Sequence, residues 1–94
     1  MISVSEAYNL VKQRLAEDYE QNEVDIHTFI EGPAVFGAIL SYKDGRNGPE
    51  DSYVIDKSSG TIKTMFILGW PIEYPDYKSW NILDIANLST RKAT

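Results

Sequence analysis

His27 is the first residue to consider for chemistry, because an imidazole can act as a general base or as a metal ligand. It is the only histidine of the chain, and the sequence contains no cysteine. It lies inside an alternating segment, and no serine or carboxylate stands at a spacing typical of nucleophilic catalysis. These features predict a surface or boundary residue of a strand. We therefore expect no enzyme activity, no catalytic residue, no metal site and no cofactor.

The glycine-rich stretch from Asp44 to Gly48 has a faint likeness to a calcium-binding loop. Arg46 occupies a position where such a loop needs an oxygen ligand, and the distal glutamate spacing is wrong. Neither this stretch nor Gly60 belongs to a phosphate-binding fingerprint. The pattern predicts plain surface turns.

An acidic cluster is the strongest charge feature of the sequence. It contains no base and comprises Glu17, Asp18, Glu20, Glu23 and Asp25. The formal net charge is −5, and residues 1–31 hold seven acids against two bases. Carboxylates at the end of a helix oppose its dipole, so either they solvate an exposed connection or they face a partner. Such a surface disfavours direct nucleic-acid binding and attracts a basic partner.

Four aromatic residues crowd the last third of the chain: Trp70, Tyr74, Tyr77 and Trp80. Tryptophan and tyrosine are enriched among interface anchors. They are equally suitable core residues for a segment that docks on a small sheet. Both interpretations stay open at this stage.

The elements that would position these residues begin with an amphipathic helix over Ile2–Tyr19. Ser3 and Glu6 form a capping-box pattern at its start. An apolar stripe at spacings of three and four follows, comprising Val4, Ala7, Tyr8, Val11, Leu15 and Tyr19.

Four strands are predicted next, over Val24–Ile30, Ala34–Tyr42, Ser52–Asp56 and Thr61–Leu68. The second is the most apolar and is expected at the centre of the sheet. In the first strand, alternation places Val24, Ile26, Thr28 and Ile30 on the buried face and Asp25, His27 and Phe29 on the other.

The segment 69–94 is expected to be irregular or briefly helical. A helix could start at Pro75 and Asp76, and Ser89–Thr94 reads as a frayed tail. The fold class predicted is α+β, one domain over 1–94, with a helix (1–19) packed on a four-stranded antiparallel meander (24–68) and a C-terminal segment (69–94).

Composition narrows the class of protein further. Hydrophobic residues make up 43% of the 94 residues, which is too apolar for a disordered chain. The longest nearly apolar run, Pro33–Leu40, is far too short to span a bilayer, and the first residues lack the pattern of an export signal. We expect a cytoplasmic protein that does not bind membranes.

Several short motifs resemble the immunity protein 35 family of small bacterial proteins. They are Met1-Ile2-Ser-x-x-Glu6-Ala7-Tyr8, Asn47-Gly48-Pro49, the hairpin Tyr53-Val54-Ile55-Asp56-Lys57-x-x-Gly60-x-Ile62, and Leu68-Gly69-Trp70-Pro71-Ile72-Glu73. The sequence departs from the family in the spacer Glu50–Ser52, in the apolar stretch Lys63–Leu68, and beyond Tyr77. The resemblance implies neutralisation of a toxin by direct stoichiometric binding.

The leading hypothesis is therefore an immunity or antitoxin-type protein whose acidic cluster meets a basic toxin surface. An alternative interface is the sheet face around His27 and Phe29, together with Trp70, Tyr74, Tyr77 and Trp80. Two other functions stay open: a chaperone-like stress protein that holds unfolded chains, and a protease-inhibitor or propeptide-like module.

Overall fold

A five-stranded antiparallel sheet organises the computed structural model, which describes the backbone of residues 1–92 and the side chains of residues 1–88. In chain order the elements are α1 (Val4–Asp18), β1 (Val24–Glu31), β2 (Val35–Tyr42), β3 (Asp51–Asp56), β4 (Ile62–Phe66), η1 (Ile67–Gly69), α2 (Trp70–Glu73), η2 (Tyr77–Ser79), β5 (Asn81–Leu83) and α3 (Ile85–Lys92). No helix within residues 1–92 is long and apolar enough to cross a membrane.

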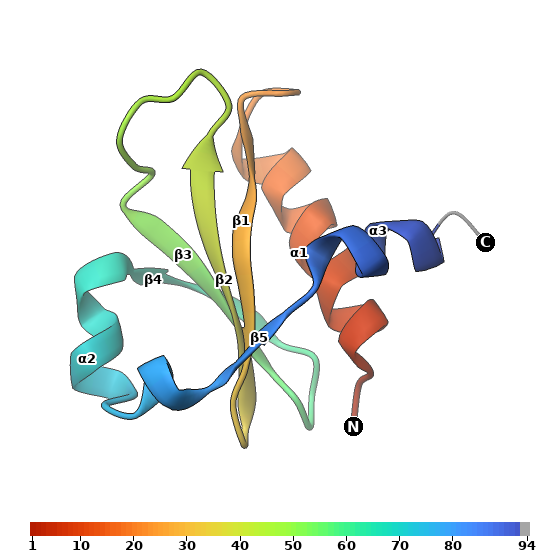
Figure 1. Ribbon diagram of the computed structural model, residues 1–94, viewed down its shortest axis with the longest axis vertical. Coiled ribbons are helices and arrows are strands. Elements are labelled where there is room, and N and C mark those ends of the chain that lie inside the picture. Colours follow the sequence, from red (N-terminus) through yellow and green to blue (C-terminus); the bar gives the residue numbers. More distant parts are fainter. Residues whose placement is uncertain (93–94) are drawn as a thin grey trace.

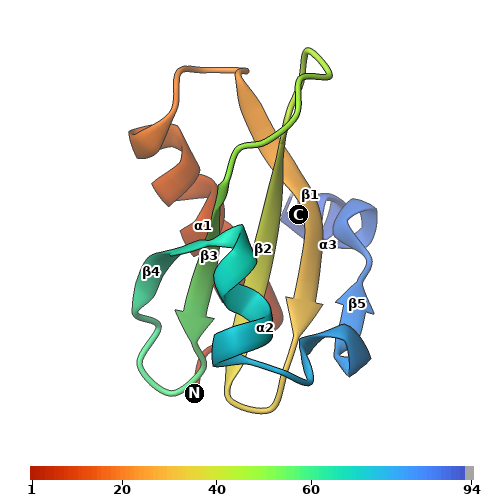
Figure 2. The same cartoon turned by 90° about the vertical axis from the view of Figure 1, so that its left-hand side faces the viewer.

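The strand order is β4-β3-β2-β1-β5. The first four strands form the predicted meander with β2 at its centre, and the α+β class is confirmed. The strand count of four is wrong, because β5 adds a fifth strand antiparallel to β1. Helices α1 and α3 cover one face of the sheet, and the segment containing α2 covers the other (Figures 1 and 2).

Helix α1 forms where its sequence predicts it. The Glu6 backbone N–H donates to Ser3 Oγ at 3.1 Å, and the Ser3 N–H donates to Glu6 Oε1 at 3.2 Å, which completes the capping box. Its buried residues Ala7, Tyr8, Val11 and Leu15 pack against the sheet. The helix spans Val4–Asp18, so the predicted bounds were too wide by two residues at the start and one at the end.

A β-bulge at His27 changes which side chains of β1 face the core. The pairing register with β2 shifts between Ile26 and Thr28, so His27 is an extra residue in the strand. One extra residue inverts the alternation that follows it. Phe29 therefore joins the α1 face, is 0% exposed and stacks on Phe36 at 5.7 Å between ring centroids. The prediction that Phe29 lies on an exposed face is wrong.

The same inversion sends Thr28 and Ile30 to the opposite face. There, Ile30 joins a second, smaller core with Val35, Val54 and Trp70. The sheet thus has a core on each face, whereas the predicted architecture placed the packed helix on one face only.

The C-terminal segment differs most from its prediction. Strand β4 ends at Phe66, and a 3-10 turn replaces the last residues of the predicted strand. The helix predicted from Pro75 is instead the 3-10 turn η2 followed by β5. Residues 89–92 continue helix α3, contrary to the predicted tail, whose last two residues lie outside the described residues.

Candidate functional site

Carboxylates from separate segments gather around Tyr19, at the end of α1. Burial raises the pKa of the Tyr19 hydroxyl, and the negative charges of Asp51, Asp18 and Glu23 raise it further. Asp51 is the first residue of β3 and was not part of the predicted cluster, because it lies far along the chain from the other carboxylates. We use "the acidic end" for these three carboxylates, Asp18, Glu23 and Asp51, together with Glu17 and Glu20, which lie within two residues of Tyr19 along the chain.

Three bases pair with the acidic cluster: Arg14 from within α1, at an i,i+4 spacing, and Lys12 and Arg46 through the folding of the chain. Arg14 Nε lies 3.1 Å from Asp18 Oδ2, Lys12 Nζ lies 3.4 Å from Asp25 Oδ1, and Arg46 reaches Glu23 at 3.9 Å. Pairs as exposed as these contribute roughly 0–1 kcal/mol each. These pairs therefore neutralise part of the negative charge of the cluster and add little to the stability of the fold.

Asp18 has a structural role that accounts for its position. The Tyr53 hydroxyl, from a residue that is 1% exposed, donates to Asp18 Oδ2 at 2.7 Å. This hydrogen bond joins the end of α1 to β3. It offsets the unfavourable interaction between the Asp18 carboxylate and the helix dipole. For Asp18, a partner-binding role is therefore not needed to explain the residue.

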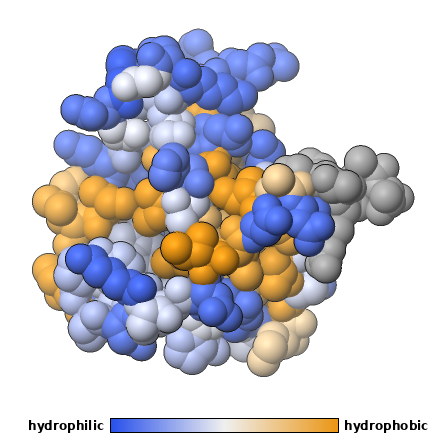
Figure 3. All heavy atoms as spheres, viewed as in Figure 1, coloured by the Kyte–Doolittle hydropathy of each residue, from blue (hydrophilic) through white to orange (hydrophobic). Residues whose placement is uncertain are grey.

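Glu17, Glu20 and Asp51 form the accessible part of the acidic end. All three are exposed, and none of them makes an ion pair within the described part of the chain. Figure 3 shows hydrophilic residues gathered over the end of the molecule where α1 stops and the loop after β2 begins. These three carboxylates are therefore the strongest candidates for contact with a basic partner.

His27 is exposed, as predicted, and its Nδ1 lies 2.7 Å from the Thr28 hydroxyl. Among residues 1–92, no group of three or more histidine, aspartate or glutamate side chains is placed to hold a metal ion. His27 and the buried Phe29 point to different surroundings, so the predicted pair does not form one interface.

The aromatic residues form a connected cluster around Trp70. Its ring centroid lies 5.4 Å from Tyr74, 5.7 Å from Tyr77 and 6.0 Å from Trp80. Trp70 is 1% exposed, so it is a core residue and not an interface anchor. Tyr74, Tyr77 and Trp80 remain half-buried at the surface.

Two contacts fix Trp70 in place. Its indole N–H donates to Ser52 Oγ at 2.7 Å, and that hydroxyl donates to the Met65 carbonyl oxygen at 2.7 Å. Its ring also lies against Gly37, where a Cβ would come within 2.5 Å of Cη2. A side chain at position 37 would therefore collide with the ring.

Exposed apolar side chains that were not among the predicted site residues lie near this cluster. Leu68, Ile72 and Ile82 are 68%, 82% and 76% exposed. A shallow groove of about 220 Å³ runs between Ile39, Trp80 and Ile82, with Lys78 at its rim. Apolar patches on a soluble protein are common at protein–protein contacts.

No family model, no curated protein and no solved structure matches the chain. The resemblance to immunity protein 35 therefore stays a proposal carried by the short motifs of the sequence.

Proposed function

We propose that this chain is an immunity or antitoxin-type protein that neutralises a bacterial toxin by direct stoichiometric binding. The observation that carries the proposal is the convergence of carboxylates at the acidic end, with Glu17 and Glu20 exposed and unpaired within the described residues. The motifs shared with the immunity protein 35 family support the same function.

The physical basis of neutralisation is charge complementarity. A toxin that acts on an anionic substrate has a basic groove, and a rigid acidic surface competes for it. Exposed carboxylates steer such a partner during encounter, and salt weakens the attraction over a Debye length of about 8–10 Å. The Tyr53–Asp18 hydrogen bond holds the end of α1 against β3, so the surface is preorganised before binding.

The exposed apolar residues favour a second candidate function. Leu68, Ile72 and Ile82 offer contact area to unfolded chains, as a chaperone-like protein would require. This function needs no single partner and no charge complementarity, so the two candidates predict different behaviour.

The test is coexpression with the protein encoded beside this chain, followed by purification of the complex. An immunity protein should protect cells from that protein and form a complex of fixed stoichiometry. The control is a heat-aggregation assay with unrelated proteins, on which an immunity protein has no effect. Suppression of aggregation without a stoichiometric partner would favour the chaperone-like function instead.

A further inference from the structure

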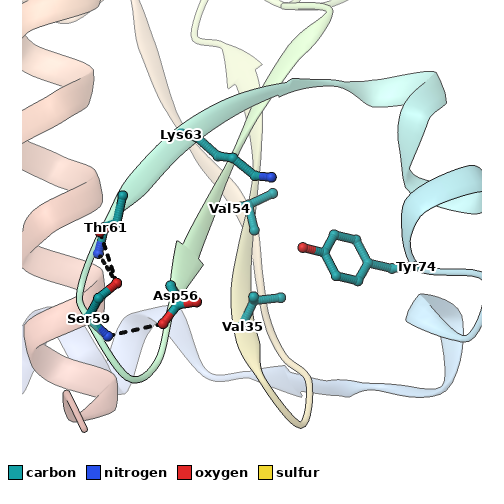
Figure 4. A pocket seen from close by; sticks show the side chains of 7 residues that line it. All are labelled: Val35, Val54, Asp56, Ser59, Thr61, Lys63 and Tyr74. Carbon is teal, nitrogen blue, oxygen red and sulfur yellow. Dashed lines mark hydrogen bonds between the residues drawn. The ribbon is translucent and has the colours of Figure 1, made fainter.

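A hollow of about 330 Å³ lies on the α2 face of the sheet, between β4 and Tyr74. Val35 and Val54, both buried, form its apolar floor. Lys63, Tyr74 and Asp56 stand around it, as Figure 4 shows. The hollow lies near the turn between β3 and β4, at the opposite end of the sheet from the turn between α1 and β1 (Figure 1).

Two hydrogen-bond donors reach this hollow without a partner. Lys63 pairs with Val54 across the β3–β4 ladder, and its ammonium extends over the floor (Figure 4). The Tyr74 hydroxyl points into the same space from the other side. Neither group makes a hydrogen bond or an ion pair within the part of the chain that the structure describes.

The Tyr74 ring is held in this direction by the aromatic cluster. It lies 5.4 Å from both Trp70 and Trp80, and its backbone N–H donates to the Trp70 carbonyl at 2.8 Å. The hydroxyl therefore needs no reorganisation to meet a ligand, which favours binding.

Asp56 adds a fixed negative charge at the rim. Its Oδ1 accepts from the Ser58 N–H at 2.8 Å, the Ser58 hydroxyl at 2.6 Å and the Ser59 N–H at 3.0 Å. The Ser58 hydroxyl contributes most to lowering the pKa of Asp56, followed by the backbone N–H groups, so the carboxylate is ionised at neutral pH. Asp56 therefore repels anions in this hollow, and it repels a dicarboxylate, which carries a second negative charge, more strongly than a monocarboxylate.

We propose that this hollow binds a small aliphatic monocarboxylate. The carboxylate accepts hydrogen bonds from the Lys63 ammonium and the Tyr74 hydroxyl, and the aliphatic body rests on Val35 and Val54. Asp56 selects against dicarboxylates. The site is separate from the acidic end, so its failure would leave the proposed toxin binding untouched.

The experiment is an NMR titration of the ¹⁵N-labelled chain with isovalerate and with its neutral isostere isovaleramide. Isovalerate should cause saturable shifts at the amides of Val54, Thr61 and Lys63, and isovaleramide should bind at least about fivefold more weakly. Glutarate, a dicarboxylate, should also bind more weakly than isovalerate. N-acetyl-leucine tests whether the ligand is a protein chain end instead of a free acid.

Lys63→Met keeps the length of the side chain and removes its charge, and it should weaken isovalerate binding by about fivefold. Lys78→Met is the matched control, because Lys78 is also exposed but lies at the rim of the other groove. The amide spectrum of each variant reports whether it is folded.

Four results would overturn the proposal. They are shifts that never saturate, equal affinity for isovalerate and isovaleramide, unchanged binding in a folded Lys63→Met variant, and glutarate binding as tight as isovalerate. Binding of N-acetyl-leucine more than about tenfold tighter than isovalerate would assign the hollow to a chain end and contradict a free small acid.

Discussion

Replacing Gly37 with alanine tests how tightly Trp70 is packed against the centre of the sheet. A Cβ at position 37 would lie 2.5 Å from Trp70 Cη2 and 3.0 Å from Ile30 Cγ1. The ring has no free direction in which to move, because Ser52 holds its N–H and three aromatic rings surround it. The added methyl group therefore strains the second core.

The size of the effect follows from two opposing contributions. Overpacking of a buried site costs about 1–3 kcal/mol, and the rigid ring places Gly37→Ala at the upper end of that range. Replacing glycine also lowers the conformational entropy of the unfolded chain, which stabilises the folded protein by about 0.4–1 kcal/mol. The expected net loss in the free energy of unfolding is about 2 kcal/mol, a large share of the ~5–15 kcal/mol typical of a domain.

The assay is urea unfolding followed by tryptophan fluorescence. At a slope of about 1–3 kcal/mol per molar for a small protein, the midpoint should fall by about 0.7–2 M. Gly69→Ala is the matched control, because its Cβ would meet only Met65, at 3.4 Å, and its φ of −77° suits alanine. That variant should stay within about 0.5 kcal/mol of wild type.

A double-mutant cycle separates the ring contact from other effects of the added methyl group. In a Trp70→Phe background, the distal ring atoms that Cβ would strike are gone, so the cost of Gly37→Ala should fall below about 1 kcal/mol. An equal cost in both backgrounds, or a single variant as stable as wild type, would refute the account of the second core.

Three further predictions concern stability. Val11 is 0% exposed, so Val11→Asp should destabilise the domain by several kcal/mol, about 3 or more, in thermal or urea unfolding; unchanged stability would mean that the stripe of α1 is misassigned. Tyr53→Phe removes the hydrogen bond to Asp18 and should cost about 1–2 kcal/mol at pH 7. Burial, and then the hydrogen bond to Asp18, raise the pKa of Tyr53 above its ordinary 10.0. The stabilisation by this hydrogen bond is therefore full below about pH 10 and is lost as the pH rises through the raised pKa. If wild type stayed more stable than Tyr53→Phe by the same amount in strong alkali, this prediction would be wrong. The pKa of Asp56 is lowered from 3.8, chiefly by the hydrogen bond from the Ser58 hydroxyl, so the ionised carboxylate stabilises the folded protein. Asp56→Ala should therefore have a lower free energy of unfolding than wild type at pH 7, and this difference should disappear as the pH falls below the lowered pKa. A difference that does not change with pH would contradict this account of the turn.

Local patterns in the sequence were sufficient to predict α1 and the meander. The Ser3–Glu6 capping box and the stripe through Val11 are satisfied within one helix, and the Asp56–Gly60 turn closes its own hairpin. Each of these features depends on residues close in sequence, where spacing alone carries the information.

The bulge at His27 could not be predicted in the same way. The segment Val24–Ile30 fits strict alternation, which hides the extra residue. Phe29 and Ile30 are both apolar, so the sequence does not decide which of the two faces the core under α1. The choice is made by the pairing with β2, where Thr28 lies opposite Ile39 and Phe29 opposite Ala38. That information lies about ten residues further along the chain.

Strand β5 depends on tertiary contacts for a similar reason. Three residues, Asn81–Leu83, have little strand propensity as a unit, and pairing with β1 stabilises them. The neighbouring Asp84 is a residue type typical of a helix N-cap and could have indicated the start of α3. Its Oδ1 accepts from the Asn87 N–H at 3.3 Å, directly before the helix begins at Ile85.

The candidate site was predicted only in outline. The excess of acid before residue 31 was visible, but its reduction by Arg46 and the addition of Asp51 depend on segments brought together by folding. Gly37 was the available sign that Trp70 is core, because a glycine in a central strand leaves room for a large ring.

The central claim is that the acidic end binds a basic toxin surface, and association kinetics with the protein encoded beside this chain test it most directly. The variants are Glu17→Lys with Glu20→Lys, single Glu20→Lys, and single Glu73→Lys as a control, since Glu73 is an exposed acid on α2. The measurement is the association rate constant by stopped flow at about 50 and about 300 mM salt, a range over which screening changes strongly. We predict that the wild-type rate falls several-fold with salt, that both variants of the acidic end associate more slowly at low salt, and that Glu73→Lys behaves like wild type. Equal rates for all four proteins, with no response to salt, would contradict the claim.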